Sequence, residues 1–529
     1  MAWTSEFMAR LSMGGEPMFA LDFADAPNPD AFDYRPERYI LHTHGISGGD
    51  HIAHALQSVS GPTQAVQLRN WQPNIGGVRA RLSGADQAYW IARVIPRGML
   101  CRLKIGFAGM EYNDWGEMGI YQFKGLSGAR NNWQMEFGDF FAYIQSRYAT
   151  TDYKDLFPDA GKQTELPARY ATSDTSITVA DNSIFTMDTD SGARGLLHVQ
   201  PDSGDPFYLK FSATPGSTTV TVDASDVIGT TRSAITASGS TDHQVTALGY
   251  INGDLPTILE KILFRRTGSV GTMPDDSNVG LHYDRKHVDQ TDWVRQANRL
   301  AVIGGFTADF IASTPLTNPW AAVSDFFDAF GMWLVMRQGA LSFRTAWDIA
   351  ADSGASIYYD DEITDADIVS VENQQLYHPD AREEYQQVAF LLTTHHDADS
   401  GSAHTMPAVM KLNHRSADRV YDVGSATTNR SNASVHLQKR LLKWYTRLPM
   451  GLSLNLLGWR WAGLVPGDVV RIHSDRIIDI MNPVASLVSP FKTISGEAFM
   501  VTSVAPDFQN FTTSIDLARL PDRPLSHIG

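Results

Sequence analysis

The strongest constraint on the fold comes from a stretch near the C-terminus. A run with helical character, Asn432 to Arg447, is followed by MGLSLNLLGWRWAGLVPGDVVRIHSDR and later by GEAFMVTSVAPDFQNFTTSIDLARL. The helix leads into a strand in which apolar and polar residues alternate. A turn at Pro466, Gly467 and Asp468 then reverses the chain direction, with Gly467 expected at the position of positive φ. Short strands with polar outer faces then close a small β-barrel, and no catalytic motif is needed to explain this region.

Short strand-like segments also alternate with turn residues through the first part of the chain. They include PMFALDFAD, ERYILHTHGIS, AVQLRNWQ, GVRARLSGAD, GMLCRLKIGFAG and GIYQFKGLSG. Regular short strands of this kind indicate a sandwich or barrel. Within them, NWQPNIGGVRARLSGAD predicts a strand, a tight turn through Gly76-Gly77, and a partner strand with Val78, Ala80 and Leu82 on one face.

The stretch that follows has a different composition. It is rich in Thr, Ser, Asp, Val and Gly and has few large apolar residues, as in TSDTSITVADNSIF and STTVTVDASDV. Such a composition predicts a small all-β insert with a thin core.

Helical signals begin after this insert. Asp254 precedes the run LPTILEKILFRR, whose apolar residues recur at helical spacing, and Thr291 or Asp292 is expected to cap WVRQANRLAVI. A further helical run, NPWAAVSDFFDAFG, leads into WLVMRQGALSFRTAWD, which predicts a hairpin turning at Gln338 and Gly339. Helix followed by hairpin is an α+β pattern, because helices do not alternate regularly with single strands.

These patterns predict an α+β chain that is mainly β, with two small β-barrel modules, a mixed α/β middle module and an all-β insert. The expected boundaries are 1–150 for the N-terminal β-barrel module, 165–250 for the Thr/Ser-rich insert, 251–430 for the mixed module, and 431–529 for a helix followed by the C-terminal β-barrel module.

Net charge and the cysteine count exclude several classes of function. Lys and Arg number 43 against 59 Asp and Glu, a net charge of −16, and such a surface repels phosphate backbones. The same sign is common in soluble proteins and would also suit a conduit for DNA. The only cysteine, Cys101, is expected as a buried strand thiol that forms no internal disulfide. We expect no membrane span and no signal peptide, hence synthesis in the cytosol.

Two groups of histidines are candidate metal ligands. A His-x-His pair at the end of a strand can direct both imidazoles to one ion, as at the start of metal-dependent amidohydrolases. That family also needs an eightfold alternation of strands and helices, whereas this chain is rich in strands, so a polar turn is the favoured interpretation. A second group lies in a segment rich in glycine and serine, which is interpreted as a solvated loop or a contact between subunits. The first group is His42, His44, Asp50, His51 and His54; the second is His395, His396, Asp397, Asp399 and His404.

Acidic and aromatic residues offer a second kind of site, for glycans. Paired carboxylates can supply the acid and base of glycan cleavage, and Trp side chains stack on sugar rings. A solvated acidic face and core packing are the favoured interpretations. The chain contains no G-x-S-x-G elbow and no P-loop, so we expect no catalytic residue, no cofactor and no metal. The candidates are Asp360, Asp361, Glu362, Asp365, Asp367, Trp444, Tyr445, Trp459 and Trp461.

The order of these segments resembles that of bacteriophage tail tip (baseplate) hub proteins of siphophages and gene transfer agents. FALDFAD and YILHTHGIS begin the N-terminal barrel, and NWQPNIGGVRARLSG and MLCRLKIGF follow. LPTILEKILFRRTG with SVGTMPDDSNVGLHYD is similar to the middle α/β module of a hub, and LVPGDVVRI lies in the end module. The resemblance covers most of the chain in order and contains no catalytic motif.

The resemblance implies a structural virion protein and no enzymatic activity. Three copies would form a ring at the tail tip, assembled in the host cytoplasm, that joins the tail tube to the distal tip and lines the DNA exit channel. The implied partners are further copies of the chain as a homotrimer, a distal tail or tube protein, a central fibre or tip protein, and DNA in transit without specific binding. A sixfold distal tail ring protein and a β-rich carbohydrate-active or glycan-binding protein remain as alternatives.

Overall fold

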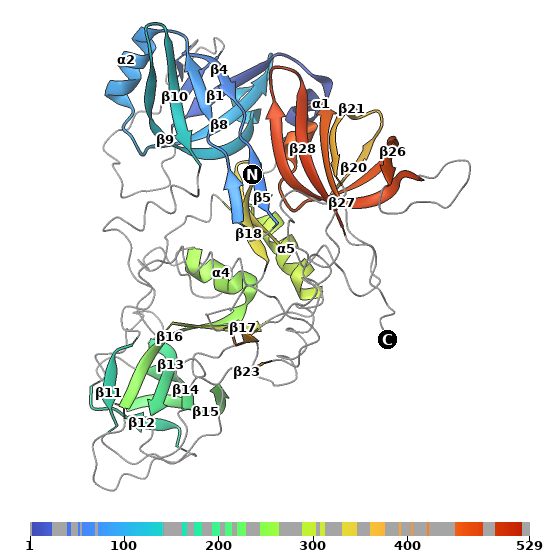
Figure 1. Ribbon diagram of the computed structural model, residues 1–529. Coiled ribbons are helices and arrows are strands. Elements are labelled where there is room, and N and C mark those ends of the chain that lie inside the picture. Colours follow the sequence, from blue (N-terminus) through green and yellow to red (C-terminus); the bar gives the residue numbers. More distant parts are fainter. Residues whose placement is uncertain are drawn as a thin grey trace.

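The computed structural model is mainly β, with several antiparallel sheets and a few short helices among the residues it describes (Figure 1). The predicted fold class, α+β and mainly β, is therefore confirmed. The residues described are 3–23, 40–43, 51–52, 55–68, 72–139, 141, 161–166, 174–181, 193–200, 207–213, 219–228, 244–263, 288–302, 307–312, 331–345, 360–375, 391–392, 404–405, 421–422, 450–479 and 492–520. The helices expected at 432–447 and in NPWAAVSDFFDAFG lie outside them.

Eight strands from the first part of the chain form one sheet in the order β3-β2-β1-β8-β9-β10-β7-β4. β1 also packs against β4, which lies at the far end of this order, so the sheet curls back toward itself. No ladder joins its two edges among the described strands, so the expected barrel is not closed there. The strands are β1 (Pro17–Asp22), β2 (Ile40–His42), β3 (His51–Ile52), β4 (Leu56–Ser60), β7 (Arg79–Leu82), β8 (Leu100–Phe107), β9 (Gly116–Ala129) and β10 (Asn132–Gly138).

Two helices accompany this sheet. In α1 (Ser5–Met13) the Thr4 hydroxyl accepts a hydrogen bond from the Phe7 amide, and the side chains of Phe7 and Leu11 are fully buried. This is the N-cap arrangement that satisfies a free amide at the start of a helix. α2 (Ala85–Val94) packs against β7, β9 and β10.

The hairpin predicted through Gly76-Gly77 is wrong. β6 (Gln72–Ile75) pairs with β5 (Gln64–Gln67), and β5 pairs with a strand from the C-terminal part of the chain, while β7 stays in the N-terminal sheet. The two glycines mark a crossing between sheets: a Cβ on Gly76 would lie 2.0 Å from Thr63 Oγ1, and one on Gly77 would lie 2.3 Å from the carbonyl oxygen of Phe137. Such close approaches need glycine as much as a tight turn does.

The face predicted for the partner strand is nevertheless present. Val78, Ala80 and Leu82 are all fully buried, whereas Arg79 and Arg81 between them are exposed. This is the period of two that places alternate side chains on opposite faces of a strand.

The C-terminal sheet has the order β20-β26-β27-β28-β25-β21, and the β5–β6 hairpin adds to it through β27. Three separate stretches of the chain therefore build it. β20 and β21 come from the range that the sequence assigns to the mixed module. The strands are β20 (Asp361–Thr364), β21 (Ile368–Gln375), β25 (Gly451–Leu457), β26 (Val469–Asp479), β27 (Lys492–Asp507) and β28 (Thr512–Arg519).

Side chains connect the two ends of this sheet. A tight turn, in which Asp367 N donates to Thr364 O, joins β20 directly to β21, so the first and last strands of the order are adjacent in the chain. Arg476 of β26 donates from Nη1 to the carbonyl oxygen of Ile368 at 3.1 Å. The sheet therefore curls so that β26, the neighbour of the edge strand β20, is bonded through a side chain to the other edge strand, β21, although no described ladder closes it into a barrel.

A third sheet contains the insert. Its order is β12-β15-β14-β13-β16-β17-β24, with β11 paired to β16, and every described element between residues 163 and 254 is a strand, as predicted. Its core consists mostly of aliphatic side chains such as Leu197, Val199 and Val220. α4 (Leu255–Leu263) follows β16 directly, as expected after Asp254. The strands are β11 (Gln163–Glu165), β12 (Ser176–Thr178), β13 (Ala193–Gln200), β14 (Phe207–Ala213), β15 (Thr219–Ile228), β16 (Gln244–Asp254), β17 (Thr307–Ala312) and β24 (Tyr421–Asp422).

Aromatic side chains join the N-terminal and C-terminal sheets, which lie side by side in Figure 1. The rings of Phe107 and Trp459 are stacked with centroids 6.0 Å apart, and Phe19 meets Phe508 edge to face at 5.3 Å. Trp459 also contacts Phe511 and donates from Nε1 to the Asp507 carbonyl oxygen at 3.0 Å. Trp459 and Phe508 thus belong to the buried cluster of the N-terminal sheet, whereas the C-terminal sheet has a core cluster of its own. Among the described helices, none combines the length and apolar character needed to cross a bilayer.

Candidate functional site

The hairpin of β18 (Met332–Arg337) and β19 (Ala340–Thr345) lies where the N-terminal sheet, the C-terminal sheet and helix α5 (Gln290–Val302) meet. Its turn falls at Gln338 and Gly339, as the sequence predicts. Their φ values of 48° and 78° are the positive pair that a two-residue hairpin turn of the primed type requires. Almost every residue of the two strands is buried, polar ones included.

Helix α5 begins earlier than the sequence suggests. The Asp289 carboxylate accepts a hydrogen bond from the Asp292 amide at 3.0 Å, so Asp289 is the capping residue. The expectation that Thr291 or Asp292 caps this helix is therefore wrong, because both lie within its first turn. The side chain of Asp292 instead points at the hairpin, where it bonds to Ser342 and Arg337.

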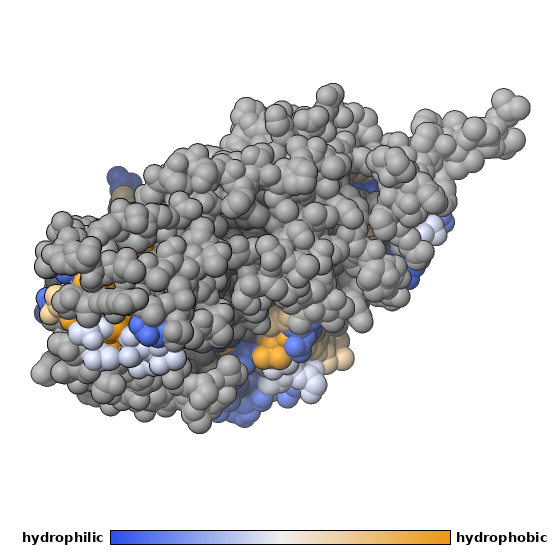
Figure 2. Space-filling model, turned by 90° about the horizontal axis from the view of Figure 1, so that it is seen from below, coloured by the Kyte–Doolittle hydropathy of each residue, from blue (hydrophilic) through white to orange (hydrophobic). Residues whose placement is uncertain are grey.

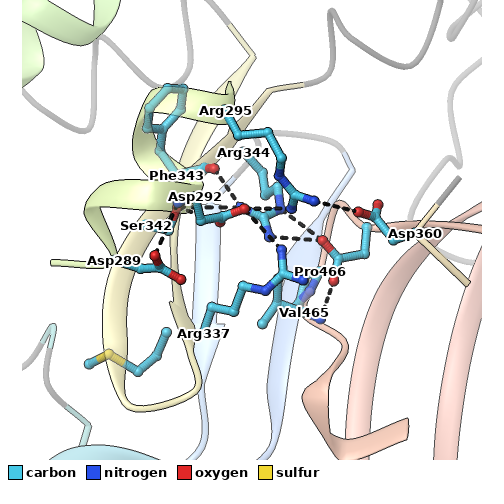
Figure 3. Close-up of polar contacts among 12 residues, drawn as sticks. Asp289, Asp292, Arg295, Arg337, Ser342, Phe343, Arg344, Asp360, Val465 and Pro466 are labelled. Atoms are coloured by element: carbon cyan, nitrogen blue, oxygen red, sulfur yellow. Dashed lines mark hydrogen bonds and ion pairs between the residues drawn. The ribbon is translucent and has the colours of Figure 1, made fainter. Parts of the chain in front are cut away.

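Arg344 is the centre of this region, and its side chain is 2% exposed (Figure 3). Its Nε and Nη2 donate to Asp468 Oδ1 at 2.9 and 2.8 Å, and its Nη1 donates to Asp292 Oδ2 at 2.6 Å and to the Phe343 carbonyl oxygen at 2.8 Å. A guanidinium held by two carboxylates and a carbonyl is well compensated for its loss of water.

Asp292 gathers further donors. Ser342 Oγ donates to its Oδ2 at 2.7 Å, Arg337 Nη1 donates to its Oδ1 at 2.9 Å, and Arg295 contacts the same oxygen from the exposed side. Arg295 also pairs with Asp360 at 3.4 Å. Because three arginines alternate with three aspartates, the site is close to electrically neutral despite its burial.

The third side of the site is the turn Val465-Pro466-Gly467-Asp468. Asp468 Oδ2 accepts from the Val465 amide at 3.0 Å, and Trp333 donates from Nε1 to the Pro466 carbonyl oxygen at 3.0 Å. Gly467 has φ of 101°, and a Cβ there would lie 2.7 Å from both Arg344 Cβ and the Trp333 ring. The hairpin therefore packs directly onto this backbone.

Opposing effects set the pKa values of the buried pair. Burial by itself would raise the pKa of Asp292, but Arg344, Arg337 and the Ser342 hydroxyl together hold it well below its usual range. Burial would likewise lower the pKa of Arg344, but Asp468 and Asp292 raise it above its ordinary value. Both groups are thus charged at neutral pH.

The other side of the hairpin contacts the N-terminal part of the chain. The Gln64 amide donates from Nε2 to the Met336 carbonyl oxygen at 2.7 Å and accepts from the Met336 amide at 3.1 Å, as a neighbouring strand would. At the turn, Gln338 Oε1 accepts from the Trp3 amide at 3.2 Å, and Trp3 Nε1 donates to the Glu117 carbonyl oxygen at 2.9 Å.

This arrangement joins segments that lie far apart in the chain. Its ionisable groups bond to one another, and its most buried members, Arg344, Asp292 and Asp468, have exposures of 1% to 4%. We name these three residues the buried triad. The triad fixes the position of the β18–β19 hairpin, and through it the positions of helix α5 and the C-terminal turn.

The structure describes only a few of the candidate metal ligands. His42 lies at the end of β2, fully buried, with its ring edge to face with Tyr112 and Trp115 at 5.7 Å. His51 is in β3 and His404 in β23 (His404–Thr405), whereas the other histidines and aspartates of both groups lie outside the described residues. No group of three or more potential metal ligands occurs among the residues that can be placed.

The acidic candidates bond within the C-terminal sheet. Asp360 Oδ2 accepts from the Val469 amide at 3.0 Å, and Asp365 Oδ2 accepts from the Asp475 amide at 3.0 Å. Asp367 accepts from Thr364 and pairs with Arg460 at 3.0 Å. Hydrogen bonding and Arg476 lower the pKa of Asp365 despite the opposing effect of burial. These bonds are those of turn-forming carboxylates.

The aromatic candidates that the structure describes are core residues. Trp459 and Trp461 are 2% and 0% exposed, so neither ring can stack on a sugar; Trp444 and Tyr445 lie outside the described residues. A polar groove between β21, β25 and β28, lined by Asn373, Ser453 and Asp516, has no aromatic side chain among its described lining residues.

Sequence reasoning missed the triad. Arg344 occurs in SFRTAW, where apolar and polar residues alternate as in a strand with one face in water. This pattern predicts an exposed arginine, and no neighbouring residue shows that both faces of the strand are covered. The only available signal was Asp468, which the sequence identifies as part of the turn. Its partner lies 124 positions away in the chain.

Comparisons with known proteins give structural likenesses, of which two are described here. No protein-family model and no curated protein sequence matches the chain. A 43 kDa tail protein of prophage MuSo2 from Shewanella oneidensis aligns with 90% of this chain and 97% of its own, at 11% identity and a TM-score of 0.33. A chain of a native gene transfer agent virion aligns with 46% of this chain and 84% of its own, at 11% identity and a TM-score of 0.21. Likenesses at these TM-scores do not establish a common fold.

Proposed function

We propose that the chain is a structural protein of a phage tail, and that it forms the hub ring of the tail tip or baseplate. The observation that carries the proposal is the union of the N-terminal and C-terminal sheets. β5 pairs with β27, and Trp459, which follows β25 of the C-terminal sheet, stacks on Phe107 within the N-terminal core. One chain thus supplies two β modules, from opposite ends of its sequence, as one packed unit.

Two modules per chain suit a protein that adapts a tube of sixfold symmetry to a tip of threefold symmetry. Three copies present six β modules around a ring, so each module can face one subunit of the tube. A closed ring of this kind needs heterologous contacts, in which one face of a copy meets a different face of the next. A homotrimer is therefore the proposed state, with 1–150 and 431–529 as the hub modules.

The proposed ring joins the tube to the distal tip and lines the exit channel for DNA. Its partners are a distal tail or tube protein and a central fibre or tip protein, and it resides in the virion after assembly in the host cytoplasm. The net charge of −16 supports passage of DNA without specific binding, because like charges repel. The junction built around the buried triad joins the mixed module, 251–430, to the C-terminal module, and the insert, 165–250, shares its sheet with β17 and β24 of the mixed module.

We further propose that the protein is not an enzyme. Asp360, Asp365 and Asp367, which could have served as acid and base, accept hydrogen bonds from backbone or side-chain donors of their own sheet. The described tryptophans that could have stacked on sugars are buried. Incubation with bacterial polysaccharides should release no reducing ends, whereas hydrolysis would favour the glycan-active alternative.

The test is a measurement of mass and symmetry. Native mass spectrometry of the purified full chain should give about three times the 58.4 kDa of one copy, and a map of the particle reconstructed without imposed symmetry should show it as a threefold ring at the tail tip. A sixfold ring would favour a distal tail ring protein. A monomer absent from the particle would overturn the proposal.

A further inference from the structure

An exposed basic face lies on the N-terminal sheet, although the chain as a whole is acidic. We define it as Arg79 and Arg81 of β7, Tyr89 and Arg93 of α2, and Arg97 just after that helix, all of which are exposed. Tyr89 has 67% of its surface in solvent, and Arg93 lies over its ring at 5.5 Å. Arginine and tyrosine are the residue types most enriched where proteins bind one another.

Strand register brings these side chains together. Arg79 faces Glu136 across the β7–β10 ladder, Glu136 faces Gly125 of β9, and a Cβ on Gly125 would lie 3.3 Å from Arg97 Nε. α2 packs on the same three strands through buried residues that include Ala88 and Ile91, and Arg93 lies on its exposed side. None of the four arginines forms an ion pair with a carboxylate of the described residues. They outnumber Glu136 of β10 and Asp86 of α2, so the face retains net positive charge.

An acidic face of similar design lies on the C-terminal sheet. We define it as side chains of the two edge strands that reach solvent from both sides of each strand: Asp361 and Glu362 of β20 and Val369, Val371 and Glu372 of β21. The segment 360–375 contains six carboxylates and neither lysine nor arginine. Val369 and Val371 are 50% and 36% exposed, so apolar contacts lie beside the charges.

Neighbouring cations neutralise only part of this acidic face. Arg460 pairs with Asp367 at 3.0 Å and Arg476 lies 3.9 Å from Asp365, whereas Glu362 contacts His473 at 3.3 Å and faces Arg471 across the β20–β26 ladder. Asp361 and Glu372 form no ion pair with a described residue. They therefore leave negative charge for a partner.

The two faces lie at opposite ends of the paired sheets: α2 and β10 at one end in Figure 1, β20, β21 and β26 at the other. Viewed from below, the coloured part of the surface shows small hydrophobic groups beside hydrophilic residues (Figure 2). The two faces as defined combine charged side chains with Tyr89, Val369 and Val371, so a contact between them would depend on charge as well as on apolar area.

We propose that the basic face of one copy binds the acidic face of the next copy of this chain. This deepens the proposed function, and it rests on that function only for the size of the ring. Opposite charges at opposite ends favour head-to-tail contact and penalise head-to-head contact, where like charges would meet. Tyr89 against Val369 and Val371 supplies the apolar centre, and the arginines and carboxylates form the rim.

The test reverses charge on each face of the full chain. Arg79→Glu/Arg81→Glu and Glu362→Lys/Glu372→Lys should each raise the dissociation constant for self-association at least about tenfold, measured by sedimentation velocity. A chain that carries all four substitutions should associate again, because its faces remain complementary. Arg10→Glu, an exposed reversal on α1, is the control and should leave association unchanged. Thermal melting should show that every variant remains folded.

Mixing the two double variants gives a sharper result. In the Arg79→Glu/Arg81→Glu variant both faces are acidic, and in the Glu362→Lys/Glu372→Lys variant both faces are basic. Each variant therefore binds only the other, so the two must alternate around an assembly. An alternating ring closes only with an even number of subunits, so the mixture should give heterodimers or even-numbered assemblies and no trimer. Self-association of the wild type should also weaken at high salt.

The outcomes separate this inference from the proposed function. Wild-type trimers that persist in both double variants would overturn the interface and leave the hub proposal standing. A wild type that never forms trimers, but loses a dimer or hexamer on charge reversal and regains it with all four substitutions, would support the interface and overturn the threefold ring. Binding of a polyanion such as heparin to the basic face, without self-association, would overturn the choice of partner.

Discussion

Trp333 donates a hydrogen bond from its indole Nε1 to the carbonyl oxygen of Pro466 at 3.0 Å, and both groups are buried. The bond joins the β18–β19 hairpin to the turn that precedes β26. An indole N–H in a core needs such a partner, and a carbonyl at a tight turn is unable to join a ladder. The two elements therefore satisfy each other, and changes at this junction should be costly.

We predict that Gly467→Val destabilises the protein strongly. The positive φ alone should cost roughly 1 to 3 kcal/mol, and the new side chain would also collide with Arg344 and Trp333 at 2.7 Å. Calorimetry should show a lower melting temperature, and particle yield should fall. Gly109→Ala isolates the cost of positive φ, because its φ is 84° and nothing lies near its Cβ position. Equal effects at the two sites would refute the packing argument.

We predict that Arg344→Met lowers the unfolding free energy by roughly 3 to 5 kcal/mol, because it leaves Asp468 buried without its cation and removes one of the three arginines that contact Asp292. Chemical denaturation measures this change. Adding Asp468→Asn should restore part of the loss by removing one of those charges. Arg10→Met, at an exposed site, is the control and should change the unfolding free energy by less than about 0.5 kcal/mol.

The effect of Arg344→Met should depend on pH. In the wild type the lowered pKa of Asp292 contributes stability that is present above the unfolded pKa of an aspartate, near 4, and is lost as the pH falls toward the folded value. The variant lacks the charge of Arg344, which opposes burial most strongly, although Arg337 and Arg295 still contact Asp292. The pKa of Asp292 should therefore rise, and its protonation should relieve part of the uncompensated negative charge. The difference in unfolding free energy should therefore shrink between pH 7 and pH 4. A constant difference would indicate that packing, rather than charge, dominates.

We predict that Trp459→Ala loosens the union of the two sheets. Loss of a buried tryptophan costs about 3 to 5 kcal/mol, and this one contacts Phe107, Phe508 and Phe511. Hydrogen exchange should accelerate at the β5–β27 pairing more than in the interior of the insert sheet. Trp133→Ala, at a half-buried site on β10, should have a smaller effect. Uniform acceleration across the chain would show that the tryptophan supports general stability only.

We predict that Cys101 resists alkylation in the folded protein. Burial, helped by the nearby charge of Asp22, raises the pKa of its thiol well above the ordinary value, so little thiolate exists at pH 8 and reagents cannot reach it. Iodoacetamide labelling followed by mass spectrometry should show modification only after denaturation. Rapid labelling of the native chain would contradict the buried position on β8.

Local patterns predicted local structure well. The Gln338-Gly339 hairpin, the start of α4 and the turn geometry at Gly467 each depend on a few neighbouring residues, and sequence shows those residues directly. The hairpin predicted at Gly76-Gly77 was wrong because its local residues do not decide the structure. Two glycines between strands fit a hairpin and a crossing between sheets equally well. Only the positions of Thr63 and Phe137 decide between them.

The buried triad was beyond the reach of sequence because its members come from three distant segments. An arginine and two aspartates are ordinary surface residues in composition, and their burial depends on which elements cover them. The candidate chemistry in the sequence, by contrast, consisted of local clusters. Where these can be placed, their carboxylates cap turns and their tryptophans fill the core.

The pairing of Ala65 with Ser503 has a consequence for synthesis on the ribosome. The two strands lie far apart in the chain, so β5 leaves the ribosome long before β27 does. Until β27 is made, the β5–β6 hairpin keeps an open strand edge. Non-local pairing of this kind slows folding and exposes nascent chains to mispairing. The N-terminal sheet can form before that point, but its union with the C-terminal sheet has to wait for β27.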